Sequence, residues 1–396
     1  MIFMGASDGV PGFADLSQLA KAALRQMKEV VAGFKPDSKE NHYVNTFVQV
    51  QSNDTGYRHH LENENDGGPV RKELSAAANG SALTHFIEWA IDTTRKDSKD
   101  FHDRLMLVIW GHAYEFTIDP VKTRTGIDSI DFAEVTKVFR DLQARLQKEY
   151  PGTDKKLDII GFDSCDLATI EMSWQLHEFA HYSLASQIDE PLPGWPLGDI
   201  LKRMKEAARP MTPSDLGTFV VRQYCGKYVG KDEETDTAVS LTLLNLDRAD
   251  EVYTATQTLA ERLVEATQDP EEVALAINLF FRSQVWEERP FVDVASLCLD
   301  LWRYSSSPQV ADAAAQLGDL LVRPNGPGRE QATSQPFVLE HGRNAHSTAR
   351  LTGVSLYAPH VAPNFDWPQA SAQYLKFVFA RDTIWGRYVE TLAQAT

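Results

Sequence analysis

The chain has 396 residues, of which 43% are hydrophobic, and it carries a net charge of −17. This size suffices for one large α/β domain with extensions or for two domains. The negative charge disfavours direct nucleic-acid binding, because the phosphate backbone would be repelled, and no apolar run is long enough to cross a bilayer. We therefore expect a protein whose partners are cationic, such as basic peptide segments.

The cysteine content and the first residues bear on the compartment. The three cysteines, Cys165, Cys225 and Cys298, lie far apart in the sequence. So sparse and odd a set argues against a disulfide framework and for a reducing environment. Residues 1–6 lack the basic flank of a secretory signal and suit a short first strand. These features predict a cytoplasmic protein.

The first half of the chain alternates strand and helix signals. Apolar runs predict strands over 1–6, 43–51, 105–112, 159–165 and 182–186, and helical spacing predicts helices over 17–32, 82–94, 132–150 and 167–179. The polar stretch 55–68 is typical of a small hairpin or loop. Apolar strands that alternate with helices indicate a mainly parallel sheet covered by helices on both faces.

The second half of the chain is predicted to be rich in helices. Helical spacing covers 249–266, 270–282, 291–304 and 310–322, and short strands are predicted over 237–246, 337–341 and 353–358. We expect two regions. Residues 1–246 form the α/β core, and residues 247–396 form a helix-rich region that returns strands to the sheet.

Two predicted strands end in residues that can act together in catalysis. The apolar run 105–110 leads to His112, and the run 159–162 leads to Asp163 and Cys165. Because catalytic groups gather at the carboxyl ends of the strands in a parallel sheet, we expect His112 and Cys165 to lie close together. A thiolate served by an imidazole that moves protons is suited to nucleophilic hydrolysis of amides.

Each of these residues alone has a simpler interpretation, since a lone cysteine is usually packing and a lone histidine is usually hydrogen-bonded. Cys225 and Cys298 fall within predicted helices, and we interpret both as core residues. For Cys165, the predicted helix from residue 167 would lower the thiol pKa through its dipole. The backbone N–H of Cys165 is also placed to hold an oxyanion.

These motifs identify a family resemblance. The chain resembles the clostripain-like cysteine peptidases, relatives of caspases, legumain and gingipains, in the run ending at His112, in the run from Ile159 to Cys165 and, more loosely, in the segment 184–195. The resemblance implies a caspase-like α/β/α sandwich in which Cys165 is the nucleophile and His112 the general acid and base of a dyad. The implied reaction is amide hydrolysis through a thioester.

One residue departs from the family pattern. The catalytic histidine is usually followed by a glycine whose N–H contributes to the oxyanion hole together with that of the cysteine. Here the residue after His112 is Ala113, which has the N–H but adopts a positive φ less readily than glycine. This departure leaves open an alternative, namely a catalytically inactive caspase-like protein that binds partners.

Acidic residues near Cys165 predict the substrate. Asp163 precedes Cys165 by two positions, so both side chains leave an extended strand toward the same face. A carboxylate there suits an Arg or Lys at P1, which the resemblance also implies. Asp189 and Glu190 follow the next predicted strand and are candidates for the pocket wall. The alternatives are a structural turn or cap for Asp163 and solvated loop charges for the other two.

If the enzyme cuts after Arg or Lys, exposed basic loops of the chain itself are also potential substrates. The segment 115–129 carries Lys122 and Arg124 among turn-prone residues, and the resemblance implies processing in this region. We expect a latent form that is activated by cleavage near Lys122 or Arg124, by the chain itself or by an activating protease or regulator, with an ordinary loop as the alternative. Such control would suit one step in a bacterial defence or signalling cascade.

A second motif predicts different chemistry. The run from His177 to His181 fits H-E-x-x-H, which on a helix places two imidazoles on one face for zinc, with Glu178 as general base. However, a strand is predicted from Tyr182, and Gln187 stands where a third histidine would fall. A zinc metalloprotease is therefore the weakest alternative. We expect no metal and no cofactor, since no loop has calcium-ligand spacing either.

Overall fold

The computed structural model describes the chain except for residues 7–13, 35–43, 53–54, 64, 66, 71–79, 96–103, 115–116, 124–125, 152–155, 208, 230–236, 287–288, 323–334, 345–346, 348–349, 359–373 and 396. The chain divides into two compact units. The first comprises Met1–Asp166, Phe179–Ala185 and Asp189–Lys227, and the second comprises Leu167–Glu178, Ser186–Ile188 and Tyr228–Thr396. The expected boundary at residue 246 stays a prediction.

A mainly parallel sheet forms the centre of the first unit. Its strands follow the order β10 (Ala180–Ala185), β9 (Leu157–Asp163), β5 (Met106–Trp110), β1 (Ile2–Gly5), β2 (Phe47–Ser52), β3 (Thr55–His60) and β4 (Gly68–Pro69). The strands from β10 to β2 are parallel, whereas β3 and β4 are antiparallel. The central strands β5 and β9 are apolar and mostly buried, as strands covered on both faces must be.

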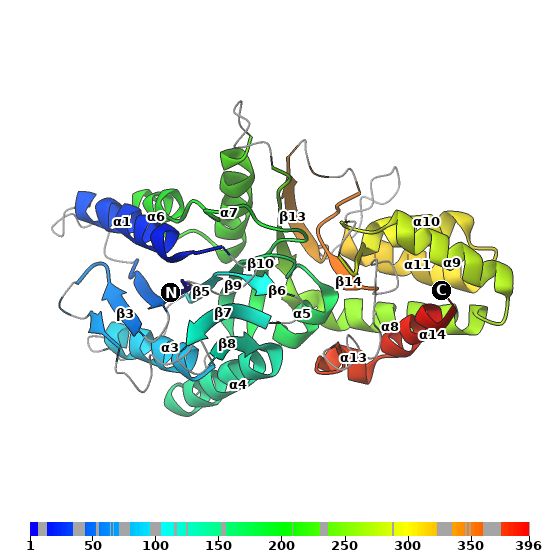
Figure 1. Cartoon of the computed structure of the whole chain (residues 1–396), viewed down its shortest axis with the longest axis horizontal. Helices are drawn as coiled ribbons and strands as arrows, with labels where there is room; N and C mark the ends of the chain where they lie inside the picture. Colours follow the sequence, from blue (N-terminus) through cyan, green and yellow to red (C-terminus); the bar gives the residue numbers. More distant parts are fainter. Residues whose placement is uncertain are drawn as a thin grey trace. The chain divides into compact units, whose positions relative to one another are not determined.

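Helices cover both faces of this sheet (Figure 1). Helix α1 (Ser17–Gly33) packs beside α6 (Leu197–Glu206) on one face, and α3 (Gly80–Arg95) packs beside α4 (Phe132–Glu149) on the other. Helix α7 (Pro213–Lys227) contacts β9 and β10. This arrangement confirms the predicted α/β/α fold with a mainly parallel sheet.

A small antiparallel sheet follows β5. It consists of β6 (Ala113–Tyr114), β7 (Thr117–Thr123) and β8 (Gly126–Asp131). The sequence predicts a turn-prone loop here, because the polar residues of this segment show no apolar alternation. Backbone pairing between β7 and β8 forms a hairpin despite that composition, and Asp131 then caps α4 through a capping box with Glu134.

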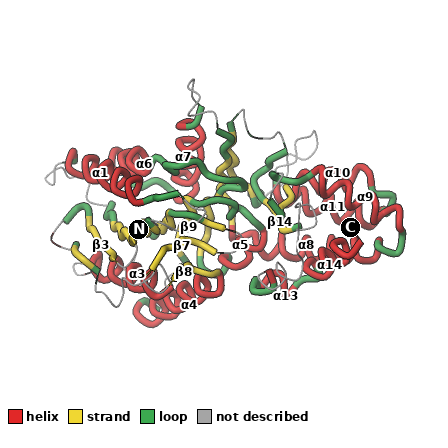
Figure 2. The backbone as a smooth tube through the Cα atoms, viewed as in Figure 1, coloured by secondary structure: helices red, strands yellow, loops and turns green. Residues whose placement is uncertain are grey.

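The second unit is built from helices and two short strand pairs (Figure 2). Its helices are α5 (Ile170–Leu176), η3 (Leu246–Arg248), α8 (Ala249–Ala266), α9 (Pro270–Arg282), α10 (Val294–Tyr304), α11 (Pro308–Leu321), α13 (Val378–Asp382) and α14 (Trp385–Ala395). Strand β11 (Ser240–Asn245) pairs with β13 (Val338–Arg343), and β12 (Phe291–Asp293) pairs with β14 (Ser355–Tyr357). The predicted helices 249–266 and 270–282 are confirmed as α8 and α9.

Two elements of the second unit differ from the prediction. The helix expected over 291–304 begins with the strand β12, whose Asp293 then caps α10 by accepting a hydrogen bond from the Ser296 N–H. The helix expected over 167–179 is the shorter α5, which begins only after Thr169 caps it. Among the helices of the described residues, none is long and apolar enough to span a bilayer.

Candidate active site

The ends of β5 and β9 bring the two candidate catalytic residues to one edge of the sheet. Trp110 pairs with Asp163 across these parallel strands, and His112 and Cys165 each follow two residues later. The Gly111 N–H donates a hydrogen bond to the Asp163 carbonyl at 3.2 Å, and this bond holds together the segments that follow the two strands. The expected juxtaposition of the strand ends is therefore present.

Cys165 is half-buried and surrounded by acidic residues. The Glu190 backbone N–H donates a hydrogen bond to its sulfur at 3.3 Å. Burial raises the pKa of the Cys165 thiol, and the negative charges of Asp189, Asp166 and Glu190 raise it further. The expected lowering of this pKa is therefore wrong for this state, because burial dominates the shift.

The imidazole of His112 is held by the backbone of the segment that precedes α1. Its Nε2 lies 2.9 Å from the Ala14 carbonyl oxygen. Because a carbonyl can only accept, Nε2 carries the proton of this hydrogen bond. In the neutral ring Nδ1 is then the nitrogen with a lone pair, and it is the atom suited to take a proton from a thiol.

Ala113 lies in an ordinary strand conformation. It is buried in β6, where it pairs with Ile118 of β7. Among the residues described, the non-glycine residue with a positive φ is Asp166, at 58°. The alanine therefore carries no cost for a left-handed backbone and gives no ground by itself for an inactive protein. The strained residue is the one directly after Cys165, and backbone strain of this kind clusters at functional sites.

Asp163 anchors the turn that follows β10. The Trp195 backbone N–H donates to both carboxylate oxygens, at 3.1 and 2.9 Å, and Asp163 is only 4% exposed. Gly194 packs against the carboxylate with a φ of +69°, and the Lys227 ammonium donates to the Gly194 carbonyl at 2.7 Å. Burial raises the pKa of Asp163 to about 6. The turn thus covers the predicted specificity residue.

Glu190 forms a carboxyl pair with Asp163. The two side chains are hydrogen-bonded to each other, and the Trp195 indole Nε1–H lies 3.4 Å from Glu190 Oε1. Burial raises the pKa of Glu190 well above its usual value, and the neighbouring Asp163 charge adds to this. Asp189, by contrast, is exposed to solvent.

Sequence patterns predict no role for Lys227 or Trp195. Lys227 is the last residue of α7, and it reaches a turn 33 residues earlier in the chain. Its ammonium also faces the charges of Asp163, Asp199 and Glu190, while burial lowers its pKa. No periodic pattern in a helix signals such a contact. The only available hint for Trp195 was its position in the loosely matching segment.

The two predicted processing residues lie in or beside the small hairpin. Lys122 is in β7, where its backbone pairs with Ile127 of β8. Arg124 lies outside the described residues. The expected open loop is thus a paired strand at Lys122, and cleavage there requires this pairing to open.

The helix that the zinc motif requires is not formed. Helix α5 ends at Leu176, and His181 lies in the strand β10, so the two histidines do not share one helix face. Within the described part of the chain, no group of three or more His, Cys, Asp or Glu side chains is arranged to hold a metal ion. The zinc alternative therefore lacks its structural basis.

Comparison with known proteins agrees with the observed fold. The model of the Clostripain family, Peptidase_C11, matches residues 14–316. An inactive zymogen C11 protease from Parabacteroides distasonis is 16% identical, with 96% of each chain covered and a TM-score of 0.57. A secreted C11 cysteine protease from Bacteroides thetaiotaomicron, in complex with an irreversible peptide inhibitor, is 15% identical, with 98% of this chain and 97% of that chain covered and a TM-score of 0.59. No curated protein matches the chain.

Proposed function

Since the chain belongs to the Clostripain family and is a cysteine peptidase of that family, we propose that it cuts peptide bonds after Arg or Lys by means of Cys165 and His112. The observation that carries the residue assignment is the exit of both side chains from the paired ends of β5 and β9. Open parallel sheets gather their catalytic groups at this edge.

The proposed reaction follows from the two side chains. His112 takes the proton of the Cys165 thiol as the sulfur attacks the scissile carbonyl, and it gives that proton to the leaving amine as the C–N bond breaks. Water then attacks the thioester, His112 takes the water proton, and the carboxylic acid leaves as the thiol is restored. The backbone N–H groups of Cys165 and Ala113 are the proposed oxyanion donors.

The acidic surroundings of Cys165 support a basic P1 residue. Asp166, Asp189 and Glu190 raise the pKa of the Cys165 thiol by their charge, and Asp163 precedes Cys165 by two residues. A guanidinium or ammonium in their midst would offset these charges and so lower the thiol pKa as the substrate binds. A basic P1 residue would thus aid both recognition and the chemical step.

The described state suits a resting enzyme. The turn that ends in Trp195 covers Asp163, and the thiol pKa is raised, so at neutral pH the sulfur is protonated. We propose that cleavage after Lys122 or Arg124 frees the hairpin and allows the turn to move. The proposed setting is the cytoplasm, in a switched role such as a bacterial defence or signalling cascade.

A P1-varied panel of fluorogenic peptides tests the activity. The wild type, Cys165→Ser and Cys225→Ser are each assayed before and after limited trypsin treatment, followed by trypsin inhibition. We expect hydrolysis after Arg and Lys to rise after treatment in the wild type and in Cys225→Ser, and to be absent in Cys165→Ser. Equal turnover by Cys165→Ser, or a preference for acidic or apolar P1 residues, would contradict the proposal.

Self-processing needs a separate experiment. Purified wild-type protein should be cut at Lys122 or Arg124 during incubation, whereas Cys165→Ala should stay intact. A double variant, Lys122→Gln with Arg124→Gln, should stay whole and gain no activity on incubation. If Cys165→Ala is cut at the same rate, the cleavage comes from another protease.

A further inference from the structure

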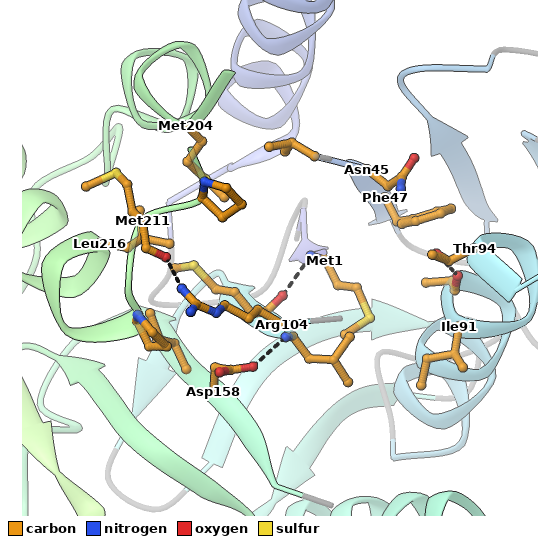
Figure 3. A pocket seen from close by; sticks show the side chains of 17 residues that line it. Met1, Asn45, Phe47, Ile91, Thr94, Arg104, Asp158, Met204, Met211 and Leu216 are labelled. Atoms are coloured by element: carbon orange, nitrogen blue, oxygen red, sulfur yellow. Dashed lines mark hydrogen bonds between the residues drawn. The ribbon is translucent and has the colours of Figure 1, made fainter. Parts of the chain in front are cut away.

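A pocket of about 370 Å³ opens at the edge of the sheet opposite the candidate active site (Figure 3). Asp158 and Ile159 line it at the start of β9, whereas Cys165 follows the end of the same strand. Met106 lines it at the start of β5, and residues of β2, α3, α6 and α7 supply the walls. The peptidase chemistry proposed above uses none of these residues.

The walls of this pocket are largely apolar and adaptable. Figure 3 shows Phe47 and Ile91 on one side and Met204, Met211 and Leu216 on the other. Methionine side chains are unbranched and polarisable, so they repack around apolar guests of varied shape. The volume lies at the small end of the range for small-molecule sites, about 300–1,000 Å³. The space therefore suits a small apolar body rather than a folded partner.

One cation projects into this apolar space. The Arg104 guanidinium reaches toward the far wall, where it donates a hydrogen bond to the Met211 carbonyl (Figure 3). A carbonyl carries no formal charge, and none of the carboxylates that the structure describes forms an ion pair with Arg104. The planar guanidinium has further N–H donors, and their fixed fork geometry matches the two oxygens of a carboxylate.

The pocket wall also contains one acidic residue, Asp158, which is hydrogen-bonded to the backbone. Asp158 accepts a hydrogen bond from the Leu105 backbone N–H at 2.7 Å, which fixes the carboxylate at the start of β9. The Met1 amino group also lines the pocket and donates to the Met106 carbonyl at 2.8 Å, but burial lowers its pKa to about 5, so it carries little charge at neutral pH. Arg104 is thus the group in the pocket wall whose charge a ligand can match.

We propose that this pocket binds a small amphipathic carboxylate, with its apolar chain against Phe47, Ile91 and Met204 and its carboxylate on the Arg104 guanidinium. The apolar walls supply the affinity, and the bidentate pair fixes the orientation. Asp158 disfavours the anion by its charge, so its removal should tighten binding.

Titration calorimetry with decanoate tests the proposal, with decanol as the neutral counterpart. The Cys165→Ala protein is used throughout, so that the reading is independent of peptidase activity. We expect decanoate to bind at least tenfold more tightly than decanol, and Arg104→Met to remove this preference. Arg104→Lys should retain part of it, and Asp158→Asn should strengthen it. Arg303→Met, an exposed residue of α10, is the matched control and should change nothing.

A second variant separates the pocket from other surfaces. Leu216→Trp fills the pocket from α7 without changing its charge, and it should weaken decanoate at least tenfold while the circular dichroism spectrum and melting temperature stay near those of the parent. Equal binding of decanoate and decanol, or unchanged affinity in both Arg104→Met and Leu216→Trp, would overturn the proposal. So would a crystal structure with decanoate bound elsewhere.

Discussion

The Glu190 backbone N–H donates a hydrogen bond to the Cys165 sulfur, so the turn after β10 is attached directly to the candidate nucleophile. The same turn presses Gly194 against Asp163 and binds that carboxylate through the Trp195 N–H. The residue proposed to read the P1 side chain and the residue proposed to cut are therefore held by one segment. We therefore expect a movement of that segment to change specificity and reactivity together.

The first prediction concerns the reactivity of the thiol. Because Asp189 raises the pKa of Cys165 by its charge, Asp189→Asn should lower that pKa and speed alkylation by iodoacetamide at pH 7.5. A change of half a pKa unit corresponds to about a threefold change in thiolate content. Ethylguanidinium, which mimics an Arg side chain, should have the same effect on the wild type. Mass spectrometry of the Cys165 peptide gives the rate.

The control for this experiment is an aspartate far from the thiol in the sequence. Asp312→Asn, on the exposed surface of α11, should leave the alkylation rate unchanged. Cys225 and Cys298 are buried and should react more slowly than Cys165 in every variant. Faster labelling of Cys298 than of Cys165, or a rate that is insensitive to both Asp189→Asn and ethylguanidinium, would contradict the proposed effect of the acidic residues on the Cys165 thiol.

The second prediction compares two glycines. Gly194 has a φ of +69°, and a Cβ there would collide with the Asp163 carboxylate, so Gly194→Ala should destabilise the protein by about 2–4 kcal/mol. Gly226 lies in α7 with open space around its Cα, so Gly226→Ala should stabilise it by about 0.5–1 kcal/mol. Urea unfolding measures both. Similar effects of the two substitutions would mean that the turn does not rest on Asp163.

Much of the site could be predicted because its signals are local. The continuous apolar runs of β5 and β9 predict buried parallel strands, and the first polar residues after them lie at the edge of the sheet that carries the candidate site. Helices α8 and α9 were predicted at their observed bounds for the same reason, since each has a clear apolar period, and α9 also begins at Asp269 followed by a proline.

The rest could not be predicted because it depends on contacts between distant segments. Nothing near Asp163 in the sequence indicates that the Trp195 N–H will occupy its oxygens or that Lys227 will support the turn. Likewise, the hairpin of β7 and β8 is stabilised by backbone pairing, which polar side chains do not signal. The apolar pattern also predicts a longer helix than α5, because α5 begins only after the Thr169 cap.

The third prediction concerns substrate choice. Asp163→Asn removes the negative charge proposed to receive the P1 cation, while its side-chain oxygen still accepts a hydrogen bond from the Trp195 N–H. We expect kcat/KM for Arg and Lys substrates to fall about 10- to 100-fold, because a charge-assisted hydrogen bond is lost. Turnover of a peptide with a neutral P1 residue should change much less. Asp141→Asn, which removes an exposed charge from α4, is the matched control.

The last prediction concerns a buried carboxyl group of the second unit. Glu171 of α5 accepts hydrogen bonds from the Tyr357 N–H at 2.9 Å and the Tyr374 hydroxyl at 3.0 Å, and burial raises its pKa to about 7. The folded state therefore binds this proton more tightly than the unfolded state does. The resulting stability is fully present below the ordinary glutamate pKa of 4.5 and is lost as the pH rises through about 7.

Glu171→Gln keeps an oxygen for both donors and cannot ionise. The difference in unfolding free energy between this variant and the wild type should therefore grow in favour of the variant by about 2–3 kcal/mol from pH 5 to pH 8. Urea unfolding at several pH values measures this difference. Glu178→Gln, an exposed residue just after the same helix, should show no such growth. A difference that stays constant with pH for Glu171→Gln would mean that Glu171 keeps its proton equilibrium on folding.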